Sequence, residues 1–176
     1  MNKDPHAPPF HGSLPPEGAE PPGGGPAAAR TLKRPGPLPP ILLVEDNPMD
    51  LDLTLRAFSK RQFANQIQVA RDGEEAMAWL PRWEAGEPMP AVMLLDINLP
   101  RMTGLEVLQA FKRHELARRI PVVVLTSSRD DRDLGKAYDL GVNSYIEKPV
   151  SFNKFIEVAG HIELYWCVFN ERPYRP

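Results

Sequence analysis

The residues that could carry chemistry stand where short apolar runs end. They are two adjacent acids, a third acid, a hydroxyl and an ammonium group: Glu45, Asp46, Asp96, Thr126 and Lys148. Three carboxylates brought close together repel one another, and a divalent cation relieves that repulsion. Hard oxygen ligands with room for water suit Mg²⁺. The residue types therefore predict a magnesium site, provided that the fold brings these positions together.

Asp96 is the candidate reactive group. A carboxylate can attack a phosphoryl group once the charge between the two is neutralised. We expect Asp46 and Asp96 to contact Mg²⁺ directly, and Glu45, which is longer by one methylene, to act through water. Lys148 would neutralise the other side of the site, and Thr126 would hydrogen-bond a phosphoryl oxygen and move toward the new charge. The set predicts phosphoryl transfer to Asp96.

The chain around these residues alternates between apolar runs and amphipathic stretches. The expected strands are 41–44, 67–70, 91–95, 122–125 and 144–146, and the expected helices are 48–60, 72–80, 105–114, 130–140 and 151–169. The first, third and fourth strands are apolar throughout, as in parallel strands that are covered on both faces. Right-handed βα units then predict a doubly wound α/β fold, whose site lies at the carboxyl ends of the strands.

Several polar residues mark the expected helix ends. Asn47 is the predicted cap of the first helix, with Pro48 at its first position. Asp72 and Ser151 are predicted caps of the second and the last helix. A polar, Pro-rich loop is expected over 81–90, before the third strand.

Each candidate residue alone has a simpler interpretation. Glu45 and Asp46 could cap the following helix, Thr126 could pair with a helix end, and Lys148 could be a solvated surface charge. The joint arrangement is harder to explain in this way, because four strand ends each supply the group that the chemistry needs. We therefore favour one shared site over four separate structural roles.

Four segments resemble the receiver domain of two-component response regulators. They are ILLVEDNPMD (41–50), MLLDINLPRMTGLEVL (93–108), VVVLTSS (122–128) and SYIEKPV (144–150), within a resemblance that extends from Ile41 to about Phe169. The resemblance implies a flavodoxin-like fold of five parallel strands in the order 2-1-3-4-5, with helices on both faces. It also implies a signalling protein that is phosphorylated by a sensor histidine kinase.

The same resemblance implies roles for individual residues. Asp96 matches the phosphoacceptor, Lys148 the lysine of the site, and Thr126 and Tyr145 the switch residues. The metal ligands implied are Glu45, Asp46, Asp96 and the main-chain carbonyl of Asn98. The acidic pair is Glu-Asp where Asp-Asp is usual, which puts only the water structure of the metal site in doubt. Gly104 matches the glycine after the phosphorylated loop, and the Lys148–Pro149 peptide bond is expected to be cis.

Composition suggests one domain behind a tail. Twelve of the 21 prolines lie in residues 1–40, which we expect to be disordered, followed by a receiver domain over 41–170 and a short tail over 171–176. The opening residues do not resemble a signal peptide, no stretch is long enough for a membrane helix, and Cys167 is the single cysteine, so a cytoplasmic protein is expected. The net charge of −2 gives no basic field for nucleic acid. We expect a stand-alone receiver without a DNA-binding output domain.

The end of the last helix is apolar on every side over 164–169. This pattern predicts a homodimer through Tyr165, Trp166 and Phe169, whereas the alternative is a helix that folds back over its own domain. The NPMDLDL run, the loop at 81–90 and the aromatic C-terminus look like small receivers that partner phytochrome-type histidine kinases. A bacterial phytochrome is therefore a candidate partner.

Two other functions compete with the phosphorylation switch. A pseudo-receiver would be a pure binding module of the same fold, and the full set of acceptor groups argues against it. An aspartyl-type phosphatase would need a second acid two residues after Asp96, and Asn98 stands there, which cannot act as an acid. We therefore expect no enzymatic activity beyond self-phosphorylation and self-dephosphorylation.

Overall fold

The computed structural model describes residues 38–128 and 130–171. The chain divides into two units, Met1–Pro35 and Gly36–Pro176, and the described residues belong to the second. The predicted disorder of residues 1–40 concerns a segment that lies almost wholly outside the described residues, and so does the predicted tail at 171–176 apart from its first residue.

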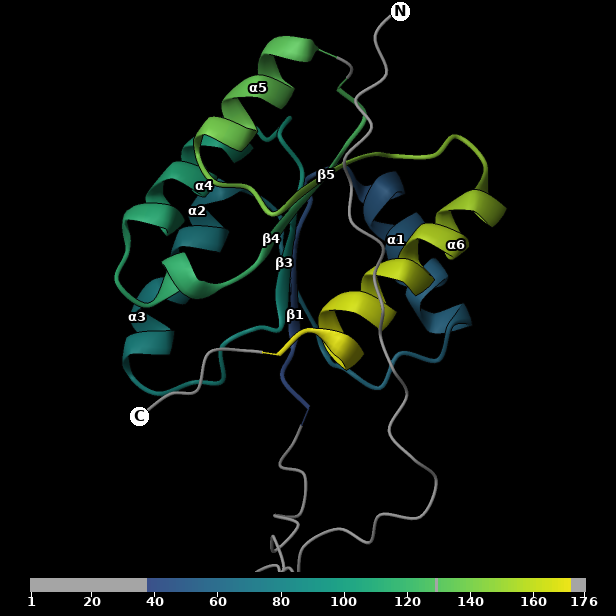
Figure 1. The fold of residues 1–176 in the computed structure, drawn as a ribbon, viewed down its shortest axis with the longest axis horizontal. Coiled ribbons are helices and arrows are strands. Elements are labelled where there is room, and N and C mark those ends of the chain that lie inside the picture. The colour runs from purple at the N-terminus through teal and green to yellow at the C-terminus, as the bar shows by residue number, and fades with distance from the viewer. Residues whose placement is uncertain (1–37, 129, 172–176) are drawn as a thin grey trace, which may run out of the picture. The chain divides into compact units, whose positions relative to one another are not determined.

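Five parallel strands form one sheet in the order β2-β1-β3-β4-β5, as predicted (Figure 1). The strands are β1 (Ile41–Val44), β2 (Ile67–Ala70), β3 (Val92–Leu95), β4 (Val122–Thr126) and β5 (Ser144–Glu147). Every residue of β1, β3 and β4 is buried, because helices cover both faces of the sheet. Val44 pairs with Leu95 and Leu95 with Val124, so the residues that follow β1 and β3 stand level at one edge of the sheet.

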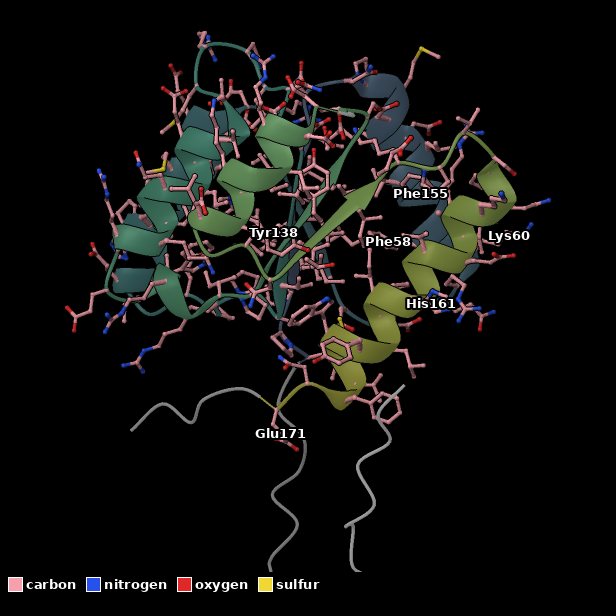
Figure 2. The ribbon with its side chains drawn as sticks, turned by 45° about the horizontal axis from the view of Figure 1, so that its top comes forward. Phe58, Lys60, Tyr138, Phe155, His161 and Glu171 are labelled. Atoms are coloured by element: carbon pink, nitrogen blue, oxygen red, sulfur yellow. The ribbon has the colours of Figure 1, made fainter. Side chains whose placement is uncertain are left out.

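The helices form two layers, one on each face of the sheet (Figure 1). Their bounds are α1 (Pro48–Lys60), α2 (Gly73–Met77), α3 (Trp79–Glu84), α4 (Gly104–Arg113), α5 (Asp131–Asp139) and α6 (Phe152–Ile162), with a short 3₁₀ turn η1 (Ala117–Arg119) and a π-helical turn η2 (Glu163–Phe169). Helices α1 and α6 cover one face, and α2 to α5 cover the other. Phe58 and Phe155, labelled in Figure 2, are buried between the sheet and the first of these layers.

Helix α1 has the bounds and the cap that the sequence predicts. The Asn47 side chain accepts hydrogen bonds from the amides of Met49 and Asp50, at 2.9 and 3.4 Å, and Pro48 occupies the first turn. Asp72 likewise caps α2, accepting from the amide of Glu75 at 2.7 Å. Ser151 lies at the cap position of α6, but its side chain makes no capping hydrogen bond, so that prediction is wrong in its chemistry.

Two segments differ from the predicted elements. The predicted helix 72–80 is split at Ala78, and α3 continues to Glu84 into the segment predicted to be a loop. Pro81 is tolerated there because it lies in the first turn of α3, where its missing N–H is not needed. The buried Trp83, stacked on Trp79 and edge-on to Phe111, holds this extra helical turn against the core.

The end of the last helix changes its hydrogen-bond register. After Ile162 the chain continues as the π-helical turn η2, whose residues Leu164, Tyr165, Val168 and Phe169 are exposed. Trp166 and Cys167 are half-buried against the core between the sheet and α6. Among the residues that the structure describes, none of the helices has the length and apolar character needed to cross a membrane.

Candidate functional site

The side chain of Lys148 joins the carboxyl ends of three elements. Its Nζ donates to Glu45 Oε2 and to Asp96 Oδ2, each at 2.6 Å, and to Asp50 Oδ2 at 2.7 Å. Glu45 follows β1, Asp96 follows β3 and Lys148 follows β5, so the parallel sheet brings these three together at one edge. The fourth group, Asp50, comes from the first turn of α1.

Both oxygens of the Asp96 carboxylate are held. Oδ1 accepts a hydrogen bond from Thr126 Oγ1 at 2.8 Å and another from the amide of Asn98 at 3.0 Å, while Oδ2 faces Lys148. The carboxylate is buried, as are Thr126 and Lys148. These hydrogen bonds fix the orientation of the buried carboxylate. The arrangement is a positioned carboxylate beside the buried ammonium group of Lys148.

Burial and hydrogen bonding act in opposite directions on the pKa values of Glu45 and Lys148. Burial raises the pKa of Glu45 to about 7, although hydrogen bonding to Lys148 lowers it in part. Burial alone would lower the pKa of Lys148, but its hydrogen bonds to Asp50, Asp96 and Glu45 outweigh burial and raise that pKa above its ordinary value. Lys148 is therefore cationic at any physiological pH.

The three carboxylates on Lys148 also bring oxygen donors close together. One oxygen from each of Glu45, Asp50 and Asp96 lies within 4.8 Å of the others, which matches the hard oxygen donors that Mg²⁺ prefers. Asp46, predicted as a direct ligand, is exposed and lies outside this group of oxygens. It lines, together with Asn98, an open hollow of about 650 Å³ beside the cluster.

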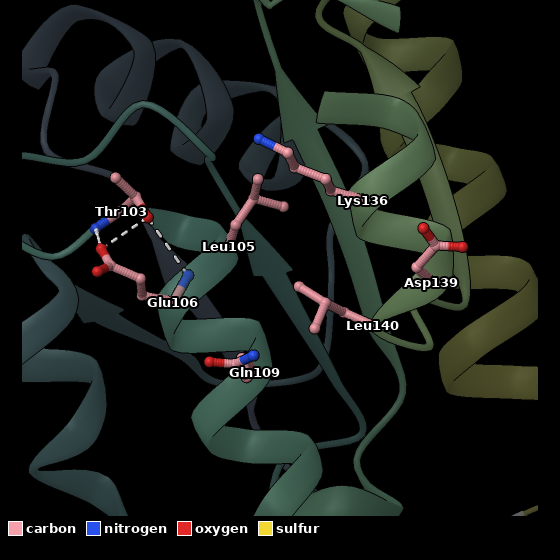
Figure 3. Close-up of a pocket in the computed structure, with 7 residues that line it drawn as sticks. All are labelled: Thr103, Leu105, Glu106, Gln109, Lys136, Asp139 and Leu140. Atoms are coloured by element: carbon pink, nitrogen blue, oxygen red, sulfur yellow. Dashed lines mark hydrogen bonds between the residues drawn. The ribbon is translucent and has the colours of Figure 1, made fainter. Parts of the chain in front are cut away.

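The loop that follows Asp96 is closed back against the strand. The amide of Gly104 donates to the carbonyl of Ile97 at 2.9 Å, and a Cβ added at Gly104 would overlap the main-chain oxygen of Asp96. Thr103 and Glu106 form a capping box at the start of α4, drawn with dashed lines in Figure 3. The glycine and the cap together position the loop that carries Asn98.

A second hollow, of about 400 Å³, adjoins the first between α4 and α5 (Figure 3). The two hollows share Thr103, Leu105 and Lys136 along their common wall. The site therefore opens onto the face of the molecule formed by these two helices.

The model of a known protein family matches the part of the chain that forms this site. The model, described as the response regulator receiver domain, matches residues 41–159. The chain belongs to the response regulator receiver domain family. Receiver domains are signalling proteins that are partnered by histidine kinases and that bind Mg²⁺ or Mn²⁺ at an acidic site.

Curated relatives of this receiver domain are matched over most of their length. The probable methanogenesis regulatory protein FilR2 of Methanothrix harundinacea is 45% identical over 134 residues, which are 76% of this chain and 86% of FilR2. The response regulator Rcp1 of Synechocystis is 38% identical over 128 residues, which are 72% of this chain and 87% of Rcp1.

Solved structures of similar receivers confirm the fold. The phosphorylated cyanobacterial phytochrome response regulator RcpA superposes with a TM-score of 0.71 at 37% identity, over 77% of this chain and 99% of RcpA. The bacteriophytochrome response regulator AtBRR has a TM-score of 0.60 at 50% identity, over 76% of this chain and 99% of AtBRR. The Mn²⁺-bound form of Rcp1 has a TM-score of 0.69 at 35% identity, over 77% of this chain and 99% of Rcp1.

In this receiver domain a chain of hydrogen bonds leads away from Asp96. Thr126 Oγ1, which donates to Asp96, accepts from the amide of Ser128 at 3.2 Å, and the Tyr145 hydroxyl donates to the Ser128 carbonyl at 3.4 Å. Tyr145 is half-buried against the core. Any movement of the Thr126 hydroxyl would thus disturb the segment to which Tyr145 is bonded.

Asp50 is the member of the cluster that the sequence analysis missed, because the search followed strand ends and Asp50 belongs to a helix. The signal that could have found it is its position in the first turn of the helix that directly follows Glu45 and Asp46. The Lys148–Pro149 peptide bond is trans, since the described residues contain no cis bond, so the expected cis bond is wrong for this structure.

Proposed function

We propose that this receiver domain is a phosphorylation switch in which Asp96 accepts a phosphoryl group from a histidine kinase and the resulting change of surface carries the signal. The observation that carries this proposal is the buried Asp96 carboxylate, held on one oxygen by Thr126 and Asn98 and on the other by Lys148. An Asp96 oxygen would form a bond to phosphorus while the bond from phosphorus to the kinase's histidine nitrogen breaks, its electron pair returning to that nitrogen. No other turnover is proposed beyond loss of the same phosphoryl group to water.

The oxygen donors at the site fit Mg²⁺. The residues that would hold it are Glu45, Asp46, Asp96 and the main-chain carbonyl of Asn98, and the bound cation would neutralise charge between the carboxylate and the incoming phosphoryl group. The Mn²⁺-bound form of Rcp1 supports a divalent cation in this family. Oxygens of Glu45 and Asp96 are already within 4.8 Å of each other, whereas Asp46 stands at the rim.

The protein's own side chains would neutralise charge at the site and rearrange after phosphorylation. Lys148 neutralises negative charge on the far side of Asp96 and remains charged throughout, because its pKa is raised. Thr126 would turn its hydroxyl from Asp96 to a phosphoryl oxygen, and Tyr145 would follow through Ser128. Phosphorylation adds a doubly charged group to a site that is already acidic, which drives this rearrangement.

Incubation with acetyl phosphate tests the proposal directly. Intact mass should rise by about 80 Da, one phosphoryl unit, in the presence of Mg²⁺ and remain unchanged with a chelator. Asp96→Asn should show no adduct, because the amide is not a nucleophile. Asp139→Asn, which removes the same charge from an exposed position at the end of α5, should be modified like the wild type. An adduct on Asp96→Asn, or one that forms equally well without Mg²⁺, would contradict the proposal.

The proposed partner is a histidine kinase of the phytochrome type. The support is the likeness to the phytochrome response regulator RcpA and the bacteriophytochrome response regulator AtBRR, at 37% and 50% identity.

We place the protein in the cytoplasm, where ATP-dependent kinases act, and set the bounds of the receiver domain at 41–170.

We further propose a homodimer through the end of the last helix. The π-helical turn η2 exposes Leu164, Tyr165, Val168 and Phe169 together. The ring of Tyr165 packs edge-on against that of Trp166, with 4.7 Å between the ring centroids. Contiguous exposed apolar side chains of this kind favour an interface between copies.

Light scattering after size exclusion tests this surface. The wild type should elute as a dimer, and Phe169→Glu should weaken association at least about tenfold because it buries an unpaired charge. Val150→Glu is the matched control, since Val150 is also an exposed apolar residue, at 96% against 66% for Phe169, but lies outside the helix. A monomeric wild type, or equal effects of the two substitutions, would contradict the dimer.

A further inference from the structure

The ammonium group of Lys148 has no hydrogen-bond donor to spare. An ammonium carries three N–H donors, and Lys148 directs one to each of Glu45, Asp50 and Asp96 at 2.6–2.7 Å. A phosphoryl oxygen on Asp96 could therefore be bound by Lys148 only after one of these bonds is given up. The choice of bond decides how the site changes on phosphorylation.

The bond to Asp50 costs least to break. The side chains of Glu45 and Asp96 are only 2% and 7% exposed, whereas that of Asp50 is 31% exposed. A buried carboxylate that loses its cation stays without a partner, whereas a partly exposed one is taken up by water. Asp50 also lies in the first turn of α1, where the positive end of the helix dipole stabilises a free carboxylate.

The backbone beneath Asp50 is fixed independently of Lys148. Its amide donates to Asn47 Oδ1 at 3.4 Å, and its carbonyl accepts from the buried Thr54 hydroxyl at 2.8 Å. Helix α1 would therefore keep its position when the side chain lets go of Lys148. The carboxylate acts on the lysine without being needed to hold the helix.

We propose that Asp50 is a positioning residue that holds Lys148 in the unphosphorylated protein and releases it to the phosphoryl group. The inference rests on the proposed function, since it concerns the same reaction. Asp50 stabilises the resting state, and its negative charge repels the phosphoryl group. Removing that charge shifts the balance toward the phosphorylated form.

Beryllofluoride, a mimic of the bound phosphoryl group, provides the test. With saturating Mg²⁺, calorimetric titration of Asp50→Asn should show beryllofluoride binding about fivefold tighter than in the wild type, the effect of one partly exposed ion pair. Asp50→Glu, which restores the charge, should return the affinity toward that of the wild type. Asp52→Asn is the matched control, because Asp52 lies on the same helix and pairs with Arg56 in solvent at 2.8 Å; it should change the affinity less than about twofold.

Titration with Mg²⁺ alone separates this role from that of a metal ligand. Asp50→Asn should keep the Mg²⁺ affinity within about threefold of the wild type, as expected for loss of a nearby charge without loss of a ligand. A drop of tenfold or more would assign Asp50 to the cation and overturn the inference. Unchanged beryllofluoride affinity in Asp50→Asn, with tight binding by the wild type, would also overturn it while leaving the proposed function intact. A wild type that takes up neither beryllofluoride nor a phosphoryl group would overturn both.

Discussion

Gly104→Ala is expected to lower the free energy of unfolding by about 3 kcal/mol. A Cβ at this position would press on the main-chain oxygen of Asp96 and lie 2.7 Å from the Cα of Ile97. Both neighbours are backbone atoms of the segment that leaves β3, so no side-chain rotation can relieve the overlap. The segment itself must move, and Asp96 moves with it. Urea denaturation measures the stability, and acetyl phosphate labelling should fall as well.

Gly135→Ala is the matched control for this substitution. Gly135 lies in α5 with nothing near the position of an added Cβ, so alanine should raise stability by about 0.5–1 kcal/mol through its better helix propensity. Labelling of this variant should equal that of the wild type. If Gly104→Ala were as stable as Gly135→Ala, the close approach of Gly104 to the Asp96 carbonyl would be disproved.

The sheet could be predicted from the sequence because its strands are buried on both faces. A run such as Ile41-Leu42-Leu43-Val44 has no polar side to turn toward water, and such runs separated by helical stretches leave few arrangements open. The same reasoning located Glu45, Asp96 and Lys148, since the ends of parallel strands meet at one edge. The pairing of Val44 with Leu95 places Glu45 and Asp96, the residues that follow them, side by side at this edge.

Features that depend on side-chain reach could not be predicted in this way. Asp50 joins the cluster because Lys148 is long enough to extend from the end of β5 to the first turn of α1, and no periodicity reports that distance. The turn at Trp79–Glu84 is held by the burial of Trp83, which overrides the loop-forming signal of Pro81. The π-helical register of η2 leaves no mark in the sequence, because the same apolar stripe suits an α-helix.

Lys148→Met is expected to lower the free energy of unfolding by about 3 kcal/mol near pH 8 in magnesium-free buffer. Methionine keeps the length and the apolar stem of lysine, so packing changes little, whereas Glu45, Asp50 and Asp96 lose the cation that all three contact. Two of these carboxylates are almost fully buried and cannot turn to water. Urea denaturation of both proteins measures the loss.

Lys136→Met removes the same charge from the lining of the hollows beside the site. Lys136 is exposed at the edge shared by the two hollows, and its loss should change stability by less than about 0.5 kcal/mol. A similar loss in both variants would mean that net charge, and not the buried contact with the carboxylates, sets the effect.

The deficit of Lys148→Met should depend on pH and on Mg²⁺. Burial holds the pKa of Glu45 at about 7 even with Lys148 present, against 4.5 for an ordinary glutamate, and removing the ammonium raises that pKa further because Lys148 lowers it. Over this pH range each folded protein binds a proton on Glu45 that its unfolded chain does not, so the free energy of unfolding falls as the pH rises. The fall is larger for Lys148→Met because its Glu45 has the higher pKa. The deficit of the variant relative to the wild type therefore grows from about pH 5 to pH 8. Saturating Mg²⁺ should recover part of the deficit at pH 8, since it supplies the missing positive charge. A deficit that is equal at both pH values and indifferent to Mg²⁺ would show that Lys148 acts by packing alone, which would remove the electrostatic basis for its role beside Asp96.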